Sequence, residues 1–249
     1  MDELPHYFSS LESFRELFAT GRPLLTYHHV GARPQGTRLK GLYISRTRFT
    51  KQMRELASNN FSAPGYDGVT SELAARNREV LLTFDDGFAD ALENAVPVLK
   101  RHGFSGIQFL VADLLGKTSE WQVSSGEIAG QLMDVAQVKD WLAAGNEIGS
   151  HTLTHPYLTR IPLPEAREEL AGSRKKLEDL FGRTVEHFCY PYGDWSPAIL
   201  ELVQEAGYKT ACTTDFGVND NTANPLLLKR ITARYPSRNL KNLIKMLKA

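Results

Sequence analysis

The chain has 249 residues, of which 42% are hydrophobic, and its 29 basic and 29 acidic side chains give a formal net charge of zero. This length can bury a full core, and single α/β barrels commonly have about this size. The balanced charge favours neither nucleic acid nor a strongly acidic protein as a partner.

In chain order, the first predicted element is a helix within residues 1–22 that ends at Gly21, and residues 23–249 then form the main domain. In this domain, apolar strand-like stretches alternate with helical ones. The seven predicted strands lie within 24–30, 80–84, 106–111, 147–151, 185–190, 208–213 and 226–231. Such alternation is typical of parallel sheets, so the sequence predicts an α/β fold, specifically a distorted (β/α)7-type barrel in a single domain.

The C-terminal segment from Leu226 contains basic residues and no acidic ones. Its last part places apolar residues on one helical face, at Leu240, Leu243, Ile244 and Leu247. We expect a helix that packs on the barrel, and the alternative is a weak contact with an anionic membrane surface. The oligomeric state is not predicted by any of these features.

Both cysteines, Cys189 and Cys212, fall within apolar strand-like stretches. This placement favours two buried thiols in a reducing compartment over a disulfide. The first residues are acidic where a secretory leader would be basic, and no apolar stretch has the length of a transmembrane helix. We therefore expect a cytoplasmic protein without a transmembrane segment.

Two adjacent carboxylates, Asp85 and Asp86, follow directly on the apolar strand at 80–84 and precede a helix predicted over 88–102. In folds with parallel strands, ligands bind at the carboxyl ends of the strands. The pair is ambiguous by itself, since one Asp could cap the helix while the other is solvated.

Two histidines four residues apart, His151 and His155, follow the strand at 147–151. A helical zincin pair would have Glu where this chain has Thr152, so we expect the pair on a strand end and a loop. With Asp86 from a neighbouring strand end, the two imidazoles provide three ligands for one divalent metal ion. Zn²⁺ suits this set, and Fe, Co, Ni and Mn remain alternatives. Asp85 would then lie beside the bound water and could accept its proton.

Three motifs in this order resemble the polysaccharide deacetylase family, also called the NodB-homology family or carbohydrate esterase family 4. They are Thr83-Phe84-Asp85-Asp86-Gly87, His151-Thr152-Leu153-Thr154-His155 and Tyr190-Pro191-Tyr192-Gly193. The resemblance spans residues 23–231. It implies a distorted (β/α) barrel that removes acetyl groups from N-acetylated or O-acetylated sugars with the help of a metal ion.

The resemblance also implies roles for individual residues. Asp85 corresponds to the catalytic base, and Asp86, His151 and His155 correspond to the metal ligands. The backbone N–H of Tyr192 corresponds to the donor that stabilises the oxyanion of the tetrahedral intermediate.

Two positions depart from the family pattern. Many members have Arg two residues before the Pro of the third motif, where this chain has Cys189, so the Arg that usually holds the catalytic Asp is missing there. The last family motif, Leu-x-x-His, supplies the acid for the leaving amine. Near residues 226–231 this chain has Lys229 and Arg230 but no histidine.

A histidine from an early strand could replace this acid. The chain resembles a branch of the family that includes biofilm poly-N-acetylglucosamine deacetylases, in which such a histidine takes the role. His28 and His29 end the predicted strand at 24–30. Because side chains alternate along a strand, only one of them can face the barrel interior, and we favour His28.

Residues near these motifs are candidates for substrate binding, namely Pro191, Trp195 and Tyr157, with Phe216 as a further candidate wall. Aromatic rings stack on sugar faces, although single aromatics also pack in cores or at rims. Trp121, in the long connection 112–131, is either a sugar-stacking ring or a loop anchor.

The predicted function is therefore metal-dependent removal of acetyl from N-acetylated sugars of a poly- or oligosaccharide, or of its precursor. The expected partner is this acetylated saccharide. Two alternatives are an amidohydrolase acting on a small non-sugar amide and a weakly catalytic carbohydrate-binding protein on the same scaffold. An iron oxygenase would use the same three ligands but leaves Asp85 and Tyr192 without roles.

Overall fold

The computed structural model describes residues 7–66 and 78–234. Its strands are β1 (Tyr7–Phe8), β2 (Leu24–Tyr27), β3 (His29–Val30), β4 (Tyr43–Ile44), β5 (Leu81–Phe84), β6 (Ile107–Leu110), β7 (Glu147–Ser150), β8 (His187–Cys189), β9 (Thr210–Phe216) and β10 (Leu228–Ala233). Its α-helices are α1 (Arg15–Phe18), α2 (Arg46–Ser58), α3 (Asp90–Asn94), α4 (Val96–His102), α5 (Val135–Ala143), α6 (Leu163–Phe181) and α7 (Pro197–Glu205). Short 3-10 helices are η1 (Glu12–Phe14), η2 (Lys40–Leu42), η4 (Glu120–Ser125), η5 (Leu158–Arg160) and η6 (Pro191–Gly193).

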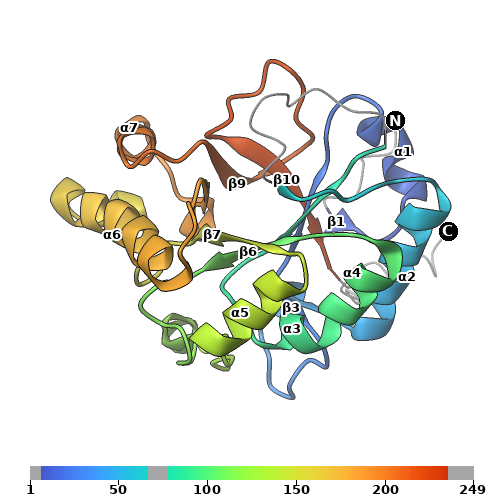
Figure 1. Ribbon diagram of the computed structural model, residues 1–249, viewed down its shortest axis with the longest axis horizontal. Helices are drawn as coiled ribbons and strands as arrows, with labels where there is room; N and C mark the ends of the chain where they lie inside the picture. Colours follow the sequence, from blue (N-terminus) through green and yellow to red (C-terminus); the bar gives the residue numbers. More distant parts are fainter. Residues whose placement is uncertain (1–6, 67–77, 235–249) are drawn as a thin grey trace, which may run out of the picture.

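Seven parallel strands close into a barrel in the order β10-β2-β5-β6-β7-β8-β9, and pairing between β9 and β10 completes the ring. The helices surround these strands (Figure 1). Both faces of β2, β5 and β6 are buried, because helices cover the outer face and side chains fill the inner one. This arrangement confirms the predicted distorted (β/α)7-type barrel.

The N-terminal segment joins the same sheet. β1 lies beside the end of β10 with Tyr7 opposite Thr232, and η1 and α1 provide the helical part expected within residues 1–22. Phe8, Phe14 and Phe18 pack together with ring centroids 5.6 to 6.0 Å apart. The segment is thus attached to the barrel by both strand pairing and apolar contact.

The helix predicted over 88–102 is divided into α3 and α4 at Ala95. The cause is Pro97, which lacks the N–H that would continue the hydrogen bonding of α3 and instead stands in the first turn of α4. The break leaves α3 as a separate short helix beside β3, where it supports the residues after β2.

A second, smaller cluster of buried apolar side chains lies among the barrel strands. Its residues are Leu24, Tyr66, Leu81, Ile107, Phe109, Cys189, Cys212 and Leu228. Both cysteines are buried free thiols, as the sequence predicted. Because side chains alternate along a strand, the positions after Leu81 and Leu228 that share their face are Thr83, Asp85 and Arg230. The positions that come next on this face, toward the carboxyl ends of the strands, are therefore polar.

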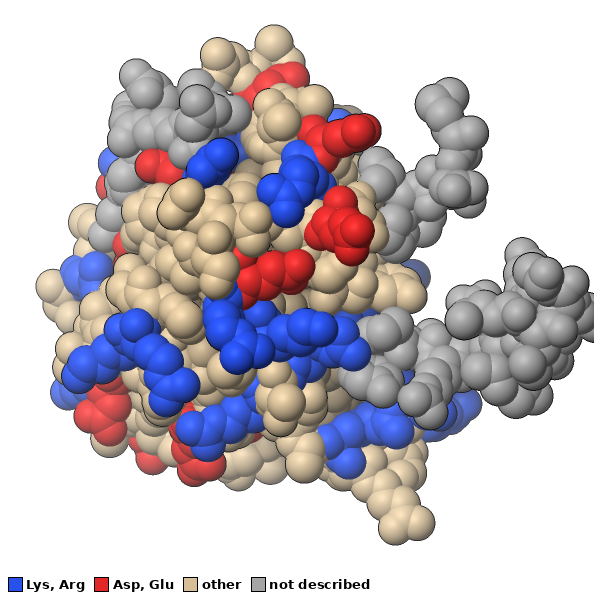
Figure 2. Space-filling view, turned by 90° about the vertical axis from the view of Figure 1, so that its right-hand side faces the viewer, with Lys and Arg blue, Asp and Glu red and all other residues tan. Residues whose placement is uncertain are grey.

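Although the net charge is zero, the charged side chains are distributed unevenly over the surface. On the face over α2 and α4, Lys and Arg side chains gather in a band (Figure 2). α2 contributes to the basic character of this face through Arg46, Lys51 and Arg54, which are all exposed. Within residues 7–66 and 78–234, no helix has the length and apolar character needed to cross a bilayer. The predicted C-terminal helix and its membrane contact lie outside the described residues.

Candidate active site

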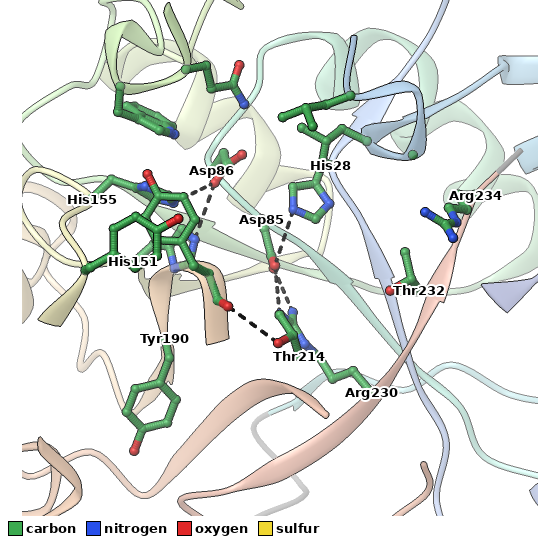
Figure 3. Close-up of a pocket in the computed structure, with 17 residues that line it drawn as sticks. His28, Asp85, Asp86, His151, His155, Tyr190, Thr214, Arg230, Thr232 and Arg234 are labelled. Atoms are coloured by element: carbon green, nitrogen blue, oxygen red, sulfur yellow. Dashed lines mark hydrogen bonds and ion pairs between the residues drawn. The ribbon is translucent and has the colours of Figure 1, made fainter. Parts of the chain in front are cut away.

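A cavity of about 440 Å³ opens at the carboxyl ends of the barrel strands. Its lining includes the predicted catalytic and metal-binding side chains His28, Asp85, Asp86, His151 and His155, which come from strands far apart in the sequence (Figure 3). The parallel order of the strands brings them together, since every strand of the barrel ends at the same rim.

Asp86, His151 and His155 form a compact buried cluster. Asp86 Oδ1 lies 3.3 Å from His151 Nε2 and 3.3 Å from His155 Nε2. Burial would raise the pKa of Asp86, but the two imidazoles in contact with it hold the pKa well below its ordinary value. Burial also lowers the pKa of His155, which favours the neutral ring that a metal ligand requires.

The hydrogen bonding of this cluster fits a divalent cation. His151 Nδ1 lies 2.7 Å from the carbonyl oxygen of Cys189 and must donate to it, because a carbonyl only accepts. In a neutral ring, Nε2 then presents a lone pair toward the carboxylate of Asp86. Two acceptors face each other there, and a cation between them would satisfy both. These three residues can therefore hold a metal ion with positions left open for water and substrate.

The loops that carry this cluster hold unusual backbone conformations. Asp86, Thr152, His155 and Tyr192 have φ of 73°, 70°, 68° and 61°, in the left-handed region that costs most side chains about 1–2 kcal/mol. Such strain is commonly concentrated at functional sites, where the surrounding structure holds it. Here it turns the side chains of Asp86 and His155 toward one another.

Asp85 has a partner that the sequence reading did not identify. Arg230 of β10 donates to both carboxylate oxygens, Nη1 to Oδ1 and Nη2 to Oδ2, at 2.8 Å each. Burial would raise the pKa of Asp85, but Arg230, with smaller contributions from nearby histidines, holds it below the ordinary value. Asp85 is therefore a buried carboxylate kept ionised next to the metal ligands.

Cys189, at the position where many family members have arginine, joins this pair. Its thiol donates to Asp85 Oδ2 at 3.7 Å and accepts from Arg230 Nη2 at 3.2 Å. Burial raises the pKa of Cys189 well above its ordinary value, so the thiol stays protonated. Arg230, on another strand, thus lies beside the carboxylate of Asp85, where the sequence predicted no partner.

The two adjacent histidines point in different directions. His28 Nε2 faces the cavity and lies 3.8 Å from Asp85 Oδ2. His29 Nδ1 lies 2.8 Å from Asp90 Oδ2, and its ring stacks between Tyr43 and Phe88 with centroids 4.2 and 3.5 Å away. Only His28 is placed where it could exchange a proton with a substrate in the cavity.

Aromatic rings form one wall of the cavity. Tyr157 and Tyr192 stack with centroids 3.7 Å apart, and Trp121 stacks on His155 at 4.5 Å. All three rings line the cavity, so Trp121 is placed where it could stack on a ligand.

The other substrate-binding candidates lie elsewhere. Pro191 is buried within η6, and Trp195 packs against the main hydrophobic core, so neither lines the cavity. Phe216, at the outer end of β9, is partly exposed and also lies outside the lining. Tyr190 and Tyr192 of the third motif do line the cavity, so position in or next to this motif does not by itself place a side chain in the site.

Comparison with known sequences identifies relatives. The profile of the polysaccharide deacetylase family matches residues 73–211, more than half of the chain. YxkH of Bacillus subtilis (strain 168), provisionally described as a polysaccharide deacetylase, is 25% identical over 218 residues, which is 84% of this chain and 70% of that protein. A chitooligosaccharide deacetylase of Azorhizobium caulinodans is 27% identical over 144 residues, 57% of this chain and 61% of the relative.

Solved structures share the barrel. The deacetylase PplD of Streptococcus pyogenes, determined with acetate, has a TM-score of 0.74 and 22% identity, covering 91% of this chain and 97% of that one. IcaB of Ammonifex degensii has a TM-score of 0.73 and 23% identity, covering 92% and 98%. At these identities, the comparisons establish a common fold.

Proposed function

Since the chain belongs to the polysaccharide deacetylase family, we propose that it hydrolyses the acetamido group of an N-acetylated saccharide, with Zn²⁺ as its metal ion. The observation that carries this proposal is the pair of carboxylates at the cavity floor. Asp86 completes a set of metal ligands, while Asp85, held by Arg230, remains free of that set. One carboxylate can bind the ion while its neighbour moves a proton.

Held by Asp86, His151 and His155, a divalent ion would supply a Lewis acid for the acetyl carbonyl and would lower the pKa of a water in the site toward neutrality. Asp85, ionised and fixed by Arg230, would accept a proton from the attacking water. The backbone N–H of Tyr192 would donate to the developing oxyanion, a contribution of about 2.7–4 kcal/mol in comparable sites.

His28 would complete the proton transfer. Burial lowers its pKa below the ordinary value, although the carboxylates of Asp85 and Asp86 oppose this effect, so the ring starts the reaction neutral at neutral pH. The proton taken by Asp85 can pass to His28 Nε2, 3.8 Å away, and then to the departing nitrogen. The products are acetate and a free amine. This route explains why an acid can be supplied without the histidine of the last family motif.

The proposal predicts metal-dependent release of acetate. Protein stripped of metal with a chelator should release no acetate from N-acetylglucosamine oligomers, and Zn²⁺ or Co²⁺ should restore release. His151→Ala should bind less metal, because it removes one of three ligands. Undiminished release by stripped protein would contradict the proposal. Binding of the oligomers without release would favour a carbohydrate-binding protein, and neither binding nor release would favour a small non-sugar amide as substrate.

A second prediction separates the two adjacent histidines. His28→Ala should lower kcat on N-acetyl sugars by about 10²-fold or more, since it removes the group that protonates the leaving nitrogen. The loss should be much smaller for p-nitrophenyl acetate, whose leaving group needs no proton. His29→Ala is the matched control, because this ring bonds Asp90 and packs between aromatic rings outside the cavity. It should lower Tm and leave kcat nearly unchanged, and the opposite pattern would assign the acid to His29.

A further inference from the structure

The cavity contains a second arginine, Arg234, that this mechanism does not use. It follows β10, where alternating side chains bring Arg230, Thr232 and Arg234 to the same face, and all three line the cavity. Figure 3 shows Arg234 on the other side of the cavity from His151 and His155. Arg230 is neutralised by Asp85, whereas Arg234 has no ion-pair partner among residues 7–66 and 78–234. Its Nε is buried and has no hydrogen-bond partner there.

Two contacts hold this guanidinium in place without neutralising it. Its Cζ lies 5.0 Å from the centroid of the Tyr7 ring. Its Nη1 lies against the backbone of Gly41, where an added Cβ would come within 2.6 Å of it. An arginine positioned in this way offers planar, paired donors that match a carboxylate or a phosphate.

Strand register places Arg234 near the proposed general acid. β10 pairs with β2 through Ile231 opposite Leu25 and Thr232 opposite Thr26. Continued by two residues, to the position just past the end of each strand, the same register brings Arg234 opposite His28. His28 serves the leaving nitrogen, so Arg234 would meet the saccharide on that side of the acetamido group.

The charges of the cavity also favour an anionic substrate. Arg230 cancels Asp85, and Asp86 cancels only one charge of a divalent ion held by the cluster. The rest of that charge and the whole charge of Arg234 remain uncompensated by the lining residues. A cavity with one sign of charge attracts ligands of the other sign and favours them over neutral ones.

We propose that Arg234 binds an anionic group, a carboxylate or a phosphate, carried by the N-acetylated saccharide on the His28 side of its acetamido group. This inference rests on the proposed function and names its substrate class, an acidic N-acetylated saccharide.

The test compares acidic and neutral substrates of matched size. Acetate release would be measured from a neutral N-acetylglucosamine tetramer and from a tetramer of alternating N-acetylglucosamine and glucuronic acid. N-acetylglucosamine and its 1-phosphate form a second pair, which distinguishes phosphate from carboxylate. Wild type should prefer the acidic member of at least one pair by roughly tenfold in kcat/KM, as for one charge-assisted contact. Arg234→Gln should abolish this preference, chiefly through KM.

Matched variants make the result specific to Arg234. Arg101→Gln, which removes an exposed arginine from α4, should keep the preference. Gly41→Val keeps Arg234 but displaces its guanidinium, so it should also reduce the preference. An equal ratio of acidic to neutral turnover in wild type and Arg234→Gln would overturn the inference.

A binding measurement separates this inference from the proposed function. Calorimetry with protein stripped of metal, which keeps the Asp85–Arg230 pair, would compare the same saccharides without turnover. Tighter binding of an acidic saccharide that Arg234→Gln removes would support the inference even if no acetate were released by wild type, in which case only the proposed function fails. Equal binding of acidic and neutral members, with and without Arg234, would overturn the inference while leaving the deacetylase activity intact.

Discussion

Asp85→Asn is expected to lower kcat for acetate release by about 10³–10⁴-fold, near the upper range for loss of a positioned general base. The amide has nearly the same shape as the carboxylate but cannot accept the proton of the attacking water. The metal should stay bound, because the proposed ligands are Asp86, His151 and His155. Rates measured at saturating metal, together with the metal content of the purified protein, test this expectation.

Asp86→Asn is the matched control for this prediction, since it makes the same chemical change in the adjacent residue. It should lose metal affinity, and added Zn²⁺ should recover part of its rate. Added metal should not rescue Asp85→Asn. If both variants lost metal equally, or if Asp85→Asn kept its rate, the separate roles assigned to the two carboxylates would be wrong.

The fold and the centre of the site were accessible from the sequence because short-range patterns determine them. Buried strands of a parallel barrel are apolar throughout, as in Leu81–Phe84, and they alternate with helices. In such a barrel every strand ends at one rim, so the sequence alone could predict that Asp86, His151 and His155 lie close together. The motifs at the ends of β5, β7 and β8 provided the chemistry.

The partner of Asp85 could not be found in this way. Arg230 reaches Asp85 from a strand 145 positions away in the sequence, and this contact exists only because β10 closes the ring. The last strand was predicted over 226–231, whereas β10 is Leu228–Ala233 and its inner face continues to Arg234. One signal was available, because Arg230 follows Leu228 on the same face of a predicted buried strand, and a buried charge needs a partner.

Arg230→Met is expected to destabilise the protein by about 3–5 kcal/mol at neutral pH, because it leaves the buried carboxylate of Asp85 without its counter-charge. It should also change the pH dependence of catalysis. In wild type, Arg230 holds the pKa of Asp85 below its ordinary value, so the base stays ionised into the acidic range. Without the arginine, only the smaller effect of nearby histidines opposes burial, so this pKa rises. The acid limb of the kcat/KM profile should therefore move to higher pH.

The loss of stability in Arg230→Met should depend on pH in a defined direction. A carboxylate with a lowered pKa stabilises the folded state above its unfolded pKa, near 3.9, and this contribution is lost as pH falls through the folded value. In Arg230→Met the pKa is raised, so acidification protonates Asp85 and relieves its unpaired charge. The difference in unfolding free energy between wild type and variant should therefore be largest near neutral pH and narrow toward pH 4, as urea unfolding would measure.

Arg22→Met is a suitable control because Arg22 is also buried, with its Nη2 3.0 Å from Glu79 Oε2, but it does not line the cavity. This variant should lose stability while the pH profile of kcat/KM keeps its position.

A second variant, Arg230→Met combined with Cys189→Arg, moves the arginine to the position that many family members use. Since Cys189 already contacts Asp85, part of the rate should return. An unshifted profile in Arg230→Met would show that some other group keeps Asp85 ionised, and the function of Arg230 would then be limited to folding.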